Sequence, residues 1–237
     1  DVVAAVGVDS KQTYVAGYKT KGFTPMHLSV MDGGLDMVEY IYYMSLNYGG
    51  MEVFLADTTG KVNLLSGSQP QLDGLKLSEN GKKAAYLDTD ANTGDTILVE
   101  IELGKEKAET VATNVQSFGY IGNTLIYYFD YTEGVGTLGA AGSKTTIANA
   151  SGVQFTEDAV YYVADADAAT GNGELRAWDG KTETAIAKDV FAFQYKGNGK
   201  LVYIGKYDVN AGVGDLYYYD GKEARKLDTG ITAIFIY

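Results

Sequence analysis

The chain has 237 residues, of which 46% are hydrophobic and 12% aromatic, and its formal net charge is -12. A surface this acidic repels phosphate backbones, which argues against nucleic acid as a partner, and the absence of cysteine excludes disulfides and thiolate metal sites. No apolar run approaches the ~18 residues that cross a bilayer, so no transmembrane segment is expected.

The predicted elements are short strands joined by turns, beginning near the N-terminus. Residues 2–8 and 13–18 are expected as strands, followed by a turn at 21–22 and a further strand over 25–30. Thirty glycines and two prolines suit a chain with many tight turns between strands. No long segment carries apolar residues at helical spacing, so helices are expected to be few and short.

Over most of its length the chain repeats one pattern, in which a tyrosine-bearing apolar strand is followed by a glycine turn. The strands end at Tyr43, Tyr86, Tyr128, Tyr162 and Tyr203. The turn glycines are Gly60, Gly104, Gly142, Gly180 and Gly221. Both markers recur after about 40 residues, a period typical of β-propeller blades when the repeat consists of short strands.

The last complete repeat shows the organisation of one unit. Strands are predicted over 190–195, 201–204, 216–219 and 224–227. A longer loop precedes the third strand, and Asp220-Gly221 forms a two-residue hairpin turn before the fourth. Four antiparallel strands, of which the outermost is the most polar, make one propeller blade.

We therefore predict an all-β, six-bladed β-propeller in a single domain. Residues 231–237 match only the first strand of a blade, and the N-terminal strands supply the other three. The two ends of the chain would thus close one blade together and leave no free sheet edge. Five or seven blades is the alternative. The predicted blades are residues 231–237 with 1–29, 30–72, 73–113, 114–151, 152–189 and 190–230.

Two stretches of the repeat resemble a known group of proteins. Residues 216–222 (LYYYDGK) and 175–181 (LRAWDGK) are similar to the tyrosine-rich propeller domains of Gram-positive surface proteins and lipoproteins. More distantly, the repeats resemble TolB-type and YWTD-type propellers, although no Tyr-Trp-Thr-Asp tetrad is present. The resemblance implies a binding or scaffold module, and it brings no catalytic residues with it.

The loops between second and third strands are acidic, and the first of them resembles a calcium loop. Asp88, Asp90, Asn92 and Asp95 alternate in a way that presents oxygens on one side of a tight turn, as Ca²⁺ requires. However, Thr93 stands where an EF-hand loop has its glycine. The competing interpretation, which we favour, is that Asp, Asn and Gly simply make good turns.

Aromatic side chains are the other candidates for ligand contact, because their faces stack on sugar rings. Most of the 20 tyrosines stand at strand positions, where packing between blades explains them. Those predicted at loop or hairpin positions are Tyr48, Tyr131, Trp178 and Tyr207, which we take as candidate binding residues.

No catalytic motif stands out in the sequence. His27 is the single histidine, there is no Gly-x-Ser-x-Gly elbow, and the carboxylates cluster in hairpin turns. The predicted function is a non-catalytic binding module that recognises a protein or a glycan through the loops of a propeller face. The alternatives are a glycoside-processing enzyme that uses loop carboxylates, and a pure scaffold domain.

The expected setting is extracytoplasmic, on a bacterial surface protein or lipoprotein. This rests on the cysteine-free, acidic composition and on the resemblance. Asp1 to Ala5 lack the basic segment that opens a secretory signal, so no signal or anchor is recognised in the sequence. The module is expected to be a monomer, and calcium is the one cofactor considered.

Overall fold

The computed structural model describes residues 75–102 and 108–235 in full, and six earlier strands by their backbone. Those strands are β1 (Gln12–Tyr14), β2 (His27–Ser29), β3 (Tyr40–Asn47), β4 (Gly50–Asp57), β5 (Val62–Leu65) and β6 (Gln71–Leu77). Every regular element in the described part of the chain is a β-strand, as the sequence predicts. The closing blade predicted from the two chain ends lies largely outside the described residues.

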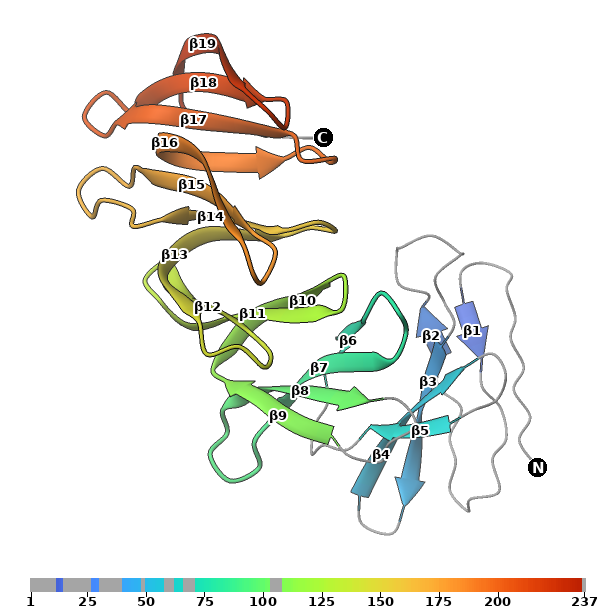
Figure 1. Ribbon diagram of the computed structural model, residues 1–237. Helices are drawn as coiled ribbons and strands as arrows, with labels where there is room; N and C mark the ends of the chain where they lie inside the picture. Colours follow the sequence, from blue (N-terminus) through green and yellow to red (C-terminus); the bar gives the residue numbers. More distant parts are fainter. Residues whose placement is uncertain are drawn as a thin grey trace. The chain divides into compact units, whose positions relative to one another are not determined.

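The chain forms two compact units (Figure 1). The first comprises residues 1–75 and 81–111, and the second comprises residues 76–80 and 112–237. Three antiparallel groups belong to the earlier part of the chain: β1 with β2, β3 to β5, and β6 with β7 (Lys83–Thr89), β8 (Thr96–Glu102) and β9 (Ala108–Thr113). The predicted single domain and its six blade boundaries stay a prediction.

The second unit is a ten-stranded sheet whose neighbours in space are neighbours in sequence. All of its described pairings are antiparallel. Its strands are β10 (Val115–Ile121), β11 (Thr124–Thr132), β12 (Val135–Ala140), β13 (Thr146–Phe155), β14 (Val160–Ala164), β15 (Gly173–Trp178), β16 (Glu183–Tyr195), β17 (Leu201–Asp208), β18 (Val213–Tyr219) and β19 (Ala224–Ile231).

Two long strands divide this sheet into four-stranded units. β13 pairs with β12 through Thr146 and Ile147, and with β14 through Gln154 and Phe155. β16 makes the same crossing, because its first half pairs with β15 and its second half with β17. Each crossing strand is therefore the fourth strand of one unit and the first of the next. We name the units blade A (115–149), blade B (150–189) and blade C (190–230), which are stacked in succession in Figure 1.

A residue with left-handed backbone stands immediately before each of the three blades, and a fourth stands near the end of blade C. The second and third of them lie within the crossing strands β13 and β16. These residues are Asn114, Asn149, Asp189 and Gly230, with φ of 54°, 56°, 55° and 73°. Asn, Asp and Gly are the residue types that adopt this conformation most readily. A second left-handed residue stands on the neighbouring strand of each blade, at Asp130, Asp165 and Lys206. The paired distortions bend the sheet, as β-bulges do.

The positions of these left-handed residues also show which tyrosines of the repeats are structurally equivalent. Tyr162 and Tyr203 each stand three residues before the left-handed residue of their strand, and in blade A that position belongs to Tyr127. The sequence pattern used Tyr128 as the marker, one residue too late. Because Tyr127 and Tyr128 are adjacent, either one can be aligned with Tyr162 from sequence alone. The position of the left-handed residue selects Tyr127.

The core lies between successive blades, because adjacent residues of a strand point to opposite faces. Blade B shows this most clearly: Tyr162 packs toward blade A, and Tyr161 packs toward blade C. The A–B core contains Ile126, Tyr128, Leu138, Val160, Tyr162 and Trp178. The B–C core contains Tyr161, Val163, Leu175, Phe193, Leu201 and Tyr203. Each such side chain stabilises the fold by about 1.5–3 kcal/mol through burial.

Candidate binding surface

The ten-stranded sheet has two chemically different edges. At one edge the β11–β12, β14–β15 and β17–β18 hairpins turn, and β13 and β16 cross between blades. We call this the crossover edge. At the opposite edge, which we call the turn edge, the hairpins β10–β11, β12–β13, β13–β14, β15–β16, β16–β17 and β18–β19 turn.

Exposed apolar side chains gather at the crossover edge. The large hydrophobic residues exposed among the described positions are Tyr131 (49%), Val135 (38%), Phe191 (37%), Val209 (52%), Leu227 (51%) and Phe235 (75%). The first four belong to the β11–β12 hairpin, the β16 crossing and the β17–β18 loop. Single exposed hydrophobic residues are ordinary, but their concentration at one edge indicates a contact surface.

Tyr131, a predicted binding residue, stands at the mouth of a groove of about 430 Å³. One wall consists of Tyr128, Tyr131 and Gly134 in blade A, and the other of Gly152, Val153 and Gln154 in blade B. Gln116 and Ser117 complete the lining. The glycines leave the groove open, and Gly134 also takes the left-handed conformation (φ 91°) that the hairpin turn requires.

Tyr128 holds the wall of this groove in place. Its ring meets that of Tyr131 edge-on, with centroids 5.8 Å apart and planes at 64°. Its hydroxyl donates a hydrogen bond to the carbonyl of Ala150 across the blade boundary, at 2.8 Å. Burial, and secondarily the neighbouring Tyr131, raise the pKa of Tyr128 to about 12. The hydroxyl therefore remains a neutral donor at physiological pH.

Tyr207, another predicted binding residue, is half of a stacked aromatic pair. Its ring lies 3.9 Å from that of Phe191, with the two planes only 8° apart. The amide of Asn172 fixes the Tyr207 backbone by donating to its carbonyl (2.9 Å) and accepting from its N–H (3.1 Å). Gly171 leaves room for the Phe191 ring, since a Cβ there would lie 3.0 Å from Phe191 Cε2. Half-exposed Phe191 therefore offers a rigid platform.

Phe191 and Asn172 are the site residues that sequence reasoning missed. Phe191 lies in a strand of alternating apolar residues, and its outward direction follows from the distortion at Asp189 rather than from that alternation. Asn172 lies in the loop between β14 and β15, where its residue type indicates only a turn. Its use as a clamp on the neighbouring blade depends on a contact 35 residues away in the sequence.

Trp178 does not join these tyrosines. It ends β15 at the turn edge and is only 3% exposed, because it packs in the A–B core. Part of it lines a separate recess of about 380 Å³ together with Thr124, Ser143 and Lys181. Tyr48, the fourth predicted binding residue, lies outside the described residues.

The predicted calcium residues form an ordinary Asp-initiated turn between β7 and β8. Asp90 Oδ1 accepts the N–H groups of Asn92 (2.8 Å) and Thr93 (3.2 Å), and these bonds lower the pKa of Asp90. Asp88 is buried, while Asn92 and Asp95 are exposed. No group of three or more acidic or histidine side chains among the described residues is arranged to hold a metal. Calcium binding stays a prediction.

The same turn recurs in blades B and C, which explains their acidic loops. Asp167 accepts the N–H groups of Ala169 (3.0 Å) and Thr170 (2.8 Å). Asp208 accepts those of Asn210 (2.8 Å) and Ala211 (3.3 Å). A carboxylate that caps its own loop keeps a negative charge at the surface while it stabilises the turn.

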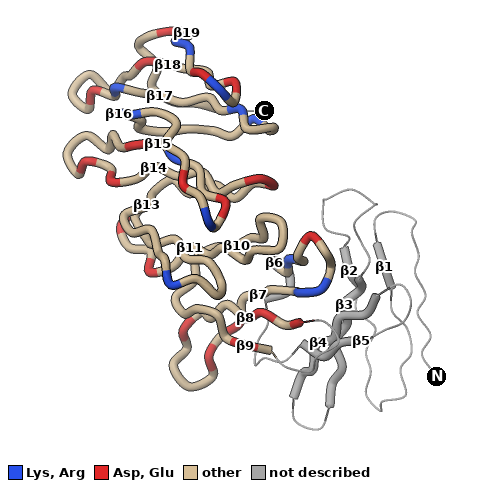
Figure 2. Tube along the Cα trace, in the orientation of Figure 1, with Lys and Arg blue, Asp and Glu red and all other residues tan. Residues whose placement is uncertain are grey.

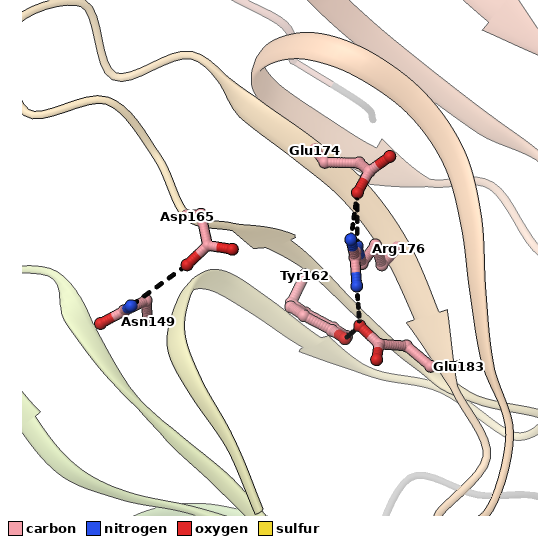
Figure 3. Close-up of polar contacts among 6 residues, drawn as sticks. All are labelled: Asn149, Tyr162, Asp165, Glu174, Arg176 and Glu183. Atoms are coloured by element: carbon pink, nitrogen blue, oxygen red, sulfur yellow. Dashed lines mark hydrogen bonds and ion pairs between the residues drawn. The ribbon is translucent and has the colours of Figure 1, made fainter.

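One group of charged side chains in blade B contains two neighbouring carboxylates, and its geometry argues against a catalytic role (Figure 3). Arg176 lies between Glu183, 2.6 Å from Nη1, and Glu174, 2.7 Å from Nε. Tyr162 also donates to Glu183. Burial raises the pKa of Glu183, but the bonds from Tyr162 and Arg176 outweigh it and leave that pKa below its usual value. Glu183 is therefore not held protonated, as a general acid must be.

No helix in the described part of the chain is long and apolar enough to cross a membrane. No protein-family model matches the chain. No curated protein sequence matches it either.

Among solved structures, the chain is similar to the β-propeller domain of the Trilobed protease from Pyrococcus furiosus, with 13% identity and a TM-score of 0.50, covering 80% of this chain and 67% of that one. It is also similar to TolB from Acinetobacter baumannii, with 14% identity and a TM-score of 0.42, covering 97% and 63%. It is similar as well to a Pyrococcus horikoshii acylaminoacyl peptidase, with 14% identity and a TM-score of 0.46, covering 79% of this chain and 37% of that one. This chain spans 44% of another acylaminoacyl peptidase. The antiparallel sheet with its crossing strands and the likeness to the Pyrococcus furiosus domain together show that this chain has a β-propeller fold.

Proposed function

We propose that this protein is a non-catalytic, extracytoplasmic binding module that contacts a protein or glycan partner through the crossover edge of its propeller. The observation that carries the proposal is the concentration of exposed aromatic and aliphatic side chains at that edge, around a groove of about 430 Å³. Exposed apolar patches on monomeric proteins commonly mark interaction sites. The resemblance to surface-protein and lipoprotein propellers supports the proposed location.

Rigidity of the edge supports a binding role. Two side-chain amides join blade B to blade C. Asn172 clamps Tyr207 at the crossover edge itself, and Gln154, nearer the turn edge, donates to Phe193 O (2.9 Å) and accepts from Tyr195 N–H (3.1 Å). Such clamps position the aromatic rings before a partner arrives. A preorganised surface loses less conformational entropy on binding.

The proposal is tested with two variants at the crossover edge and one elsewhere. Tyr131→Ala and Phe191→Ala each remove an exposed ring at this edge, whereas Leu227→Ala removes a side chain of similar exposure (51%) on β19. Binding would be measured against cell-wall glycan oligomers and against cationic and anionic peptides. We expect a bound probe whose affinity falls about five- to tenfold in the first two variants, as aromatic interface residues commonly show, and is unchanged in the third.

Two results would overturn this function. The first is an absence of binding to every probe by the native chain, which would favour the scaffold alternative. The second is equal weakening in all three variants, which would show that the crossover edge has no special role. Melting temperatures measured alongside would identify any variant that loses binding by unfolding.

A further inference from the structure

Charge is distributed unequally between the two edges of the ten-stranded sheet. The acidic residues at or beside the crossover edge are Asp130, Glu133, Asp165, Asp167, Glu174, Asp189, Asp208 and Asp215. The cationic residues found there among the described residues are Lys188 and Lys206, together with Arg176 and Lys226, which are bonded to Glu174 and Asp215. Figure 2 shows this acidity plainly on the β14–β15 loop.

The turn edge carries both signs in comparable numbers. Its described lysines are Lys144, Lys181, Lys196, Lys200 and Lys222. The acidic residues at this edge are Glu157, Asp158, Asp179, Glu183, Asp220 and Glu223. The acidic character of the second unit is therefore a property of the crossover edge rather than of the whole surface.

Some of the crossover-edge charge is neutralised within the protein and some faces solvent. Glu174 pairs with Arg176, and Asp215 lies 2.8 Å from Lys226. Asp167 bonds only to groups of its own loop, which lower its pKa and keep it ionised. Glu133 is exposed beside Tyr131, at the tip of the β11–β12 hairpin. These last two carboxylates are available to a cationic partner.

Resting on the proposed function, we propose that the partner is an extended, lysine- or arginine-rich polypeptide segment, one of whose cationic side chains lies over Tyr131 at the groove between blades A and B. Tyr131 is 49% exposed, so part of its ring surface is open to a cation from solution. Glu133 lies two residues from Tyr131 in the β11–β12 hairpin, and Asp167 lies in the β14–β15 loop of blade B at the same edge. Both supply complementary charge. Gln116 and Ser117 supply neutral hydrogen-bonding groups in its lining.

Charge complementarity decides between the candidate partners. A neutral glycan would gain no net Coulombic attraction from the carboxylates, and an anionic lipid or nucleic acid would be repelled by them. A polycationic peptide gains at every acidic position along the edge and is also steered toward it. Contact with Tyr131 in the groove then fixes where the peptide binds along the edge.

The test uses the whole chain and a fluorescent nonalysine peptide, with nonaglutamate and an N-acetylglucosamine hexamer as comparison probes. We expect nonalysine to bind with an affinity that falls steeply with salt, and neither comparison probe to bind. Tyr131→Ala is expected to weaken nonalysine about fivefold, the scale of an exposed cation–π contact.

Two double variants with the same change of net charge serve as the control for nonspecific electrostatic attraction. Glu133→Gln with Asp167→Asn removes two charges at the crossover edge. Glu223→Gln with Asp179→Asn removes two at the turn edge, where Asp179 caps its loop as Asp167 does. Asn preserves both caps. We expect about tenfold weakening from the first pair at low salt and less than twofold from the second.

Each other outcome overturns the inference in a recognisable way. Equal weakening by the two double variants would show that nonalysine adheres to an acidic protein without a site. Binding of the N-acetylglucosamine hexamer in a Tyr131-dependent manner, without nonalysine binding, would refute the cationic partner and leave the proposed function standing. Probe binding that is indifferent to both Tyr131 and Phe191 would refute both.

Discussion

At the residue scale, the hydroxyl of Tyr128 links the interblade core to the candidate groove. Replacing Tyr128 by Phe keeps the ring but leaves the Ala150 carbonyl without this donor. A buried hydrogen bond lost in this way costs about 1–2 kcal/mol. We expect the Tyr128→Phe variant to unfold at lower urea concentration with an unchanged slope, and Tyr131→Phe, on an exposed ring, to behave like the native chain.

The same residue predicts a dependence on alkaline pH. Its pKa rises from the ordinary 10.0 to about 12 in the folded protein. The stability that depends on the neutral hydroxyl is thus fully present below pH 10 and is lost as the pH rises through 12. Unfolding curves across that interval should converge for the native chain and Tyr128→Phe. Parallel curves would show that this hydroxyl does not carry the effect.

At the element scale, the crossing of strands between blades depends on pairs of left-handed residues. Asn149 and Asp165 form such a pair: the Asp165 N–H donates to the Asn149 carbonyl, and Asn149 Nδ2 donates to Asp165 Oδ1, both at 3.1 Å. Asn114 and Asp130 repeat it, with bonds of 3.1 and 3.3 Å. Asp189 and Lys206 occupy the equivalent positions in blade C with opposite charges.

Two substitutions separate backbone strain from side-chain bonding at this pair. Asn149→Gly keeps the φ of 56° without strain but removes the amide, whereas Asn149→Ala removes the amide and also strains the backbone. We expect unfolding free energies lowered by about 0.5–1 kcal/mol for Gly and about 2 kcal/mol for Ala. Equal losses in the two variants would show that the left-handed backbone is not what distinguishes this position.

The strands and hairpins could be predicted from sequence, but their crossings could not. Alternation over 190–195 and the Asp220-Gly221 turn identify local structure, because local residues determine it. The left-handed residues are Asn, Asp, Gly or Lys within otherwise strand-like sequence, so no single residue type marks them. The candidate site could be predicted only in part for the same reason. The loop position of Tyr131 identifies it from sequence, whereas the exposure of Phe191 depends on the strand crossing. Trp178 is predicted at a hairpin, but the A–B core buries it.

At the scale of the whole molecule, blade C has one face that no described blade covers. Its strands direct Tyr203 and Tyr217 toward blade B, so Val202, Leu216 and Tyr218 point the other way and are only partly buried. The Tyr218 ring is partly shielded by Arg225, whose guanidinium carbon lies 5.3 Å from the ring centre. At the A–B and B–C boundaries, the equivalent face is buried by the next blade.

The sequence predicts that residues 231–237 and 1–29 supply the missing neighbour as a composite blade. β19 already follows the pattern of the earlier crossings, since Gly230 is left-handed and Ile231 pairs with Gly214 of β18. If the chain ends close the propeller, deleting residues 1–29 uncovers the apolar face of blade C. We then expect a lower melting temperature, binding of a hydrophobic dye, and self-association in sedimentation experiments, because an uncovered sheet face and edge promote aggregation. A truncated chain that stays monomeric and melts like the native chain would show instead that the N-terminal residues do not close the ring.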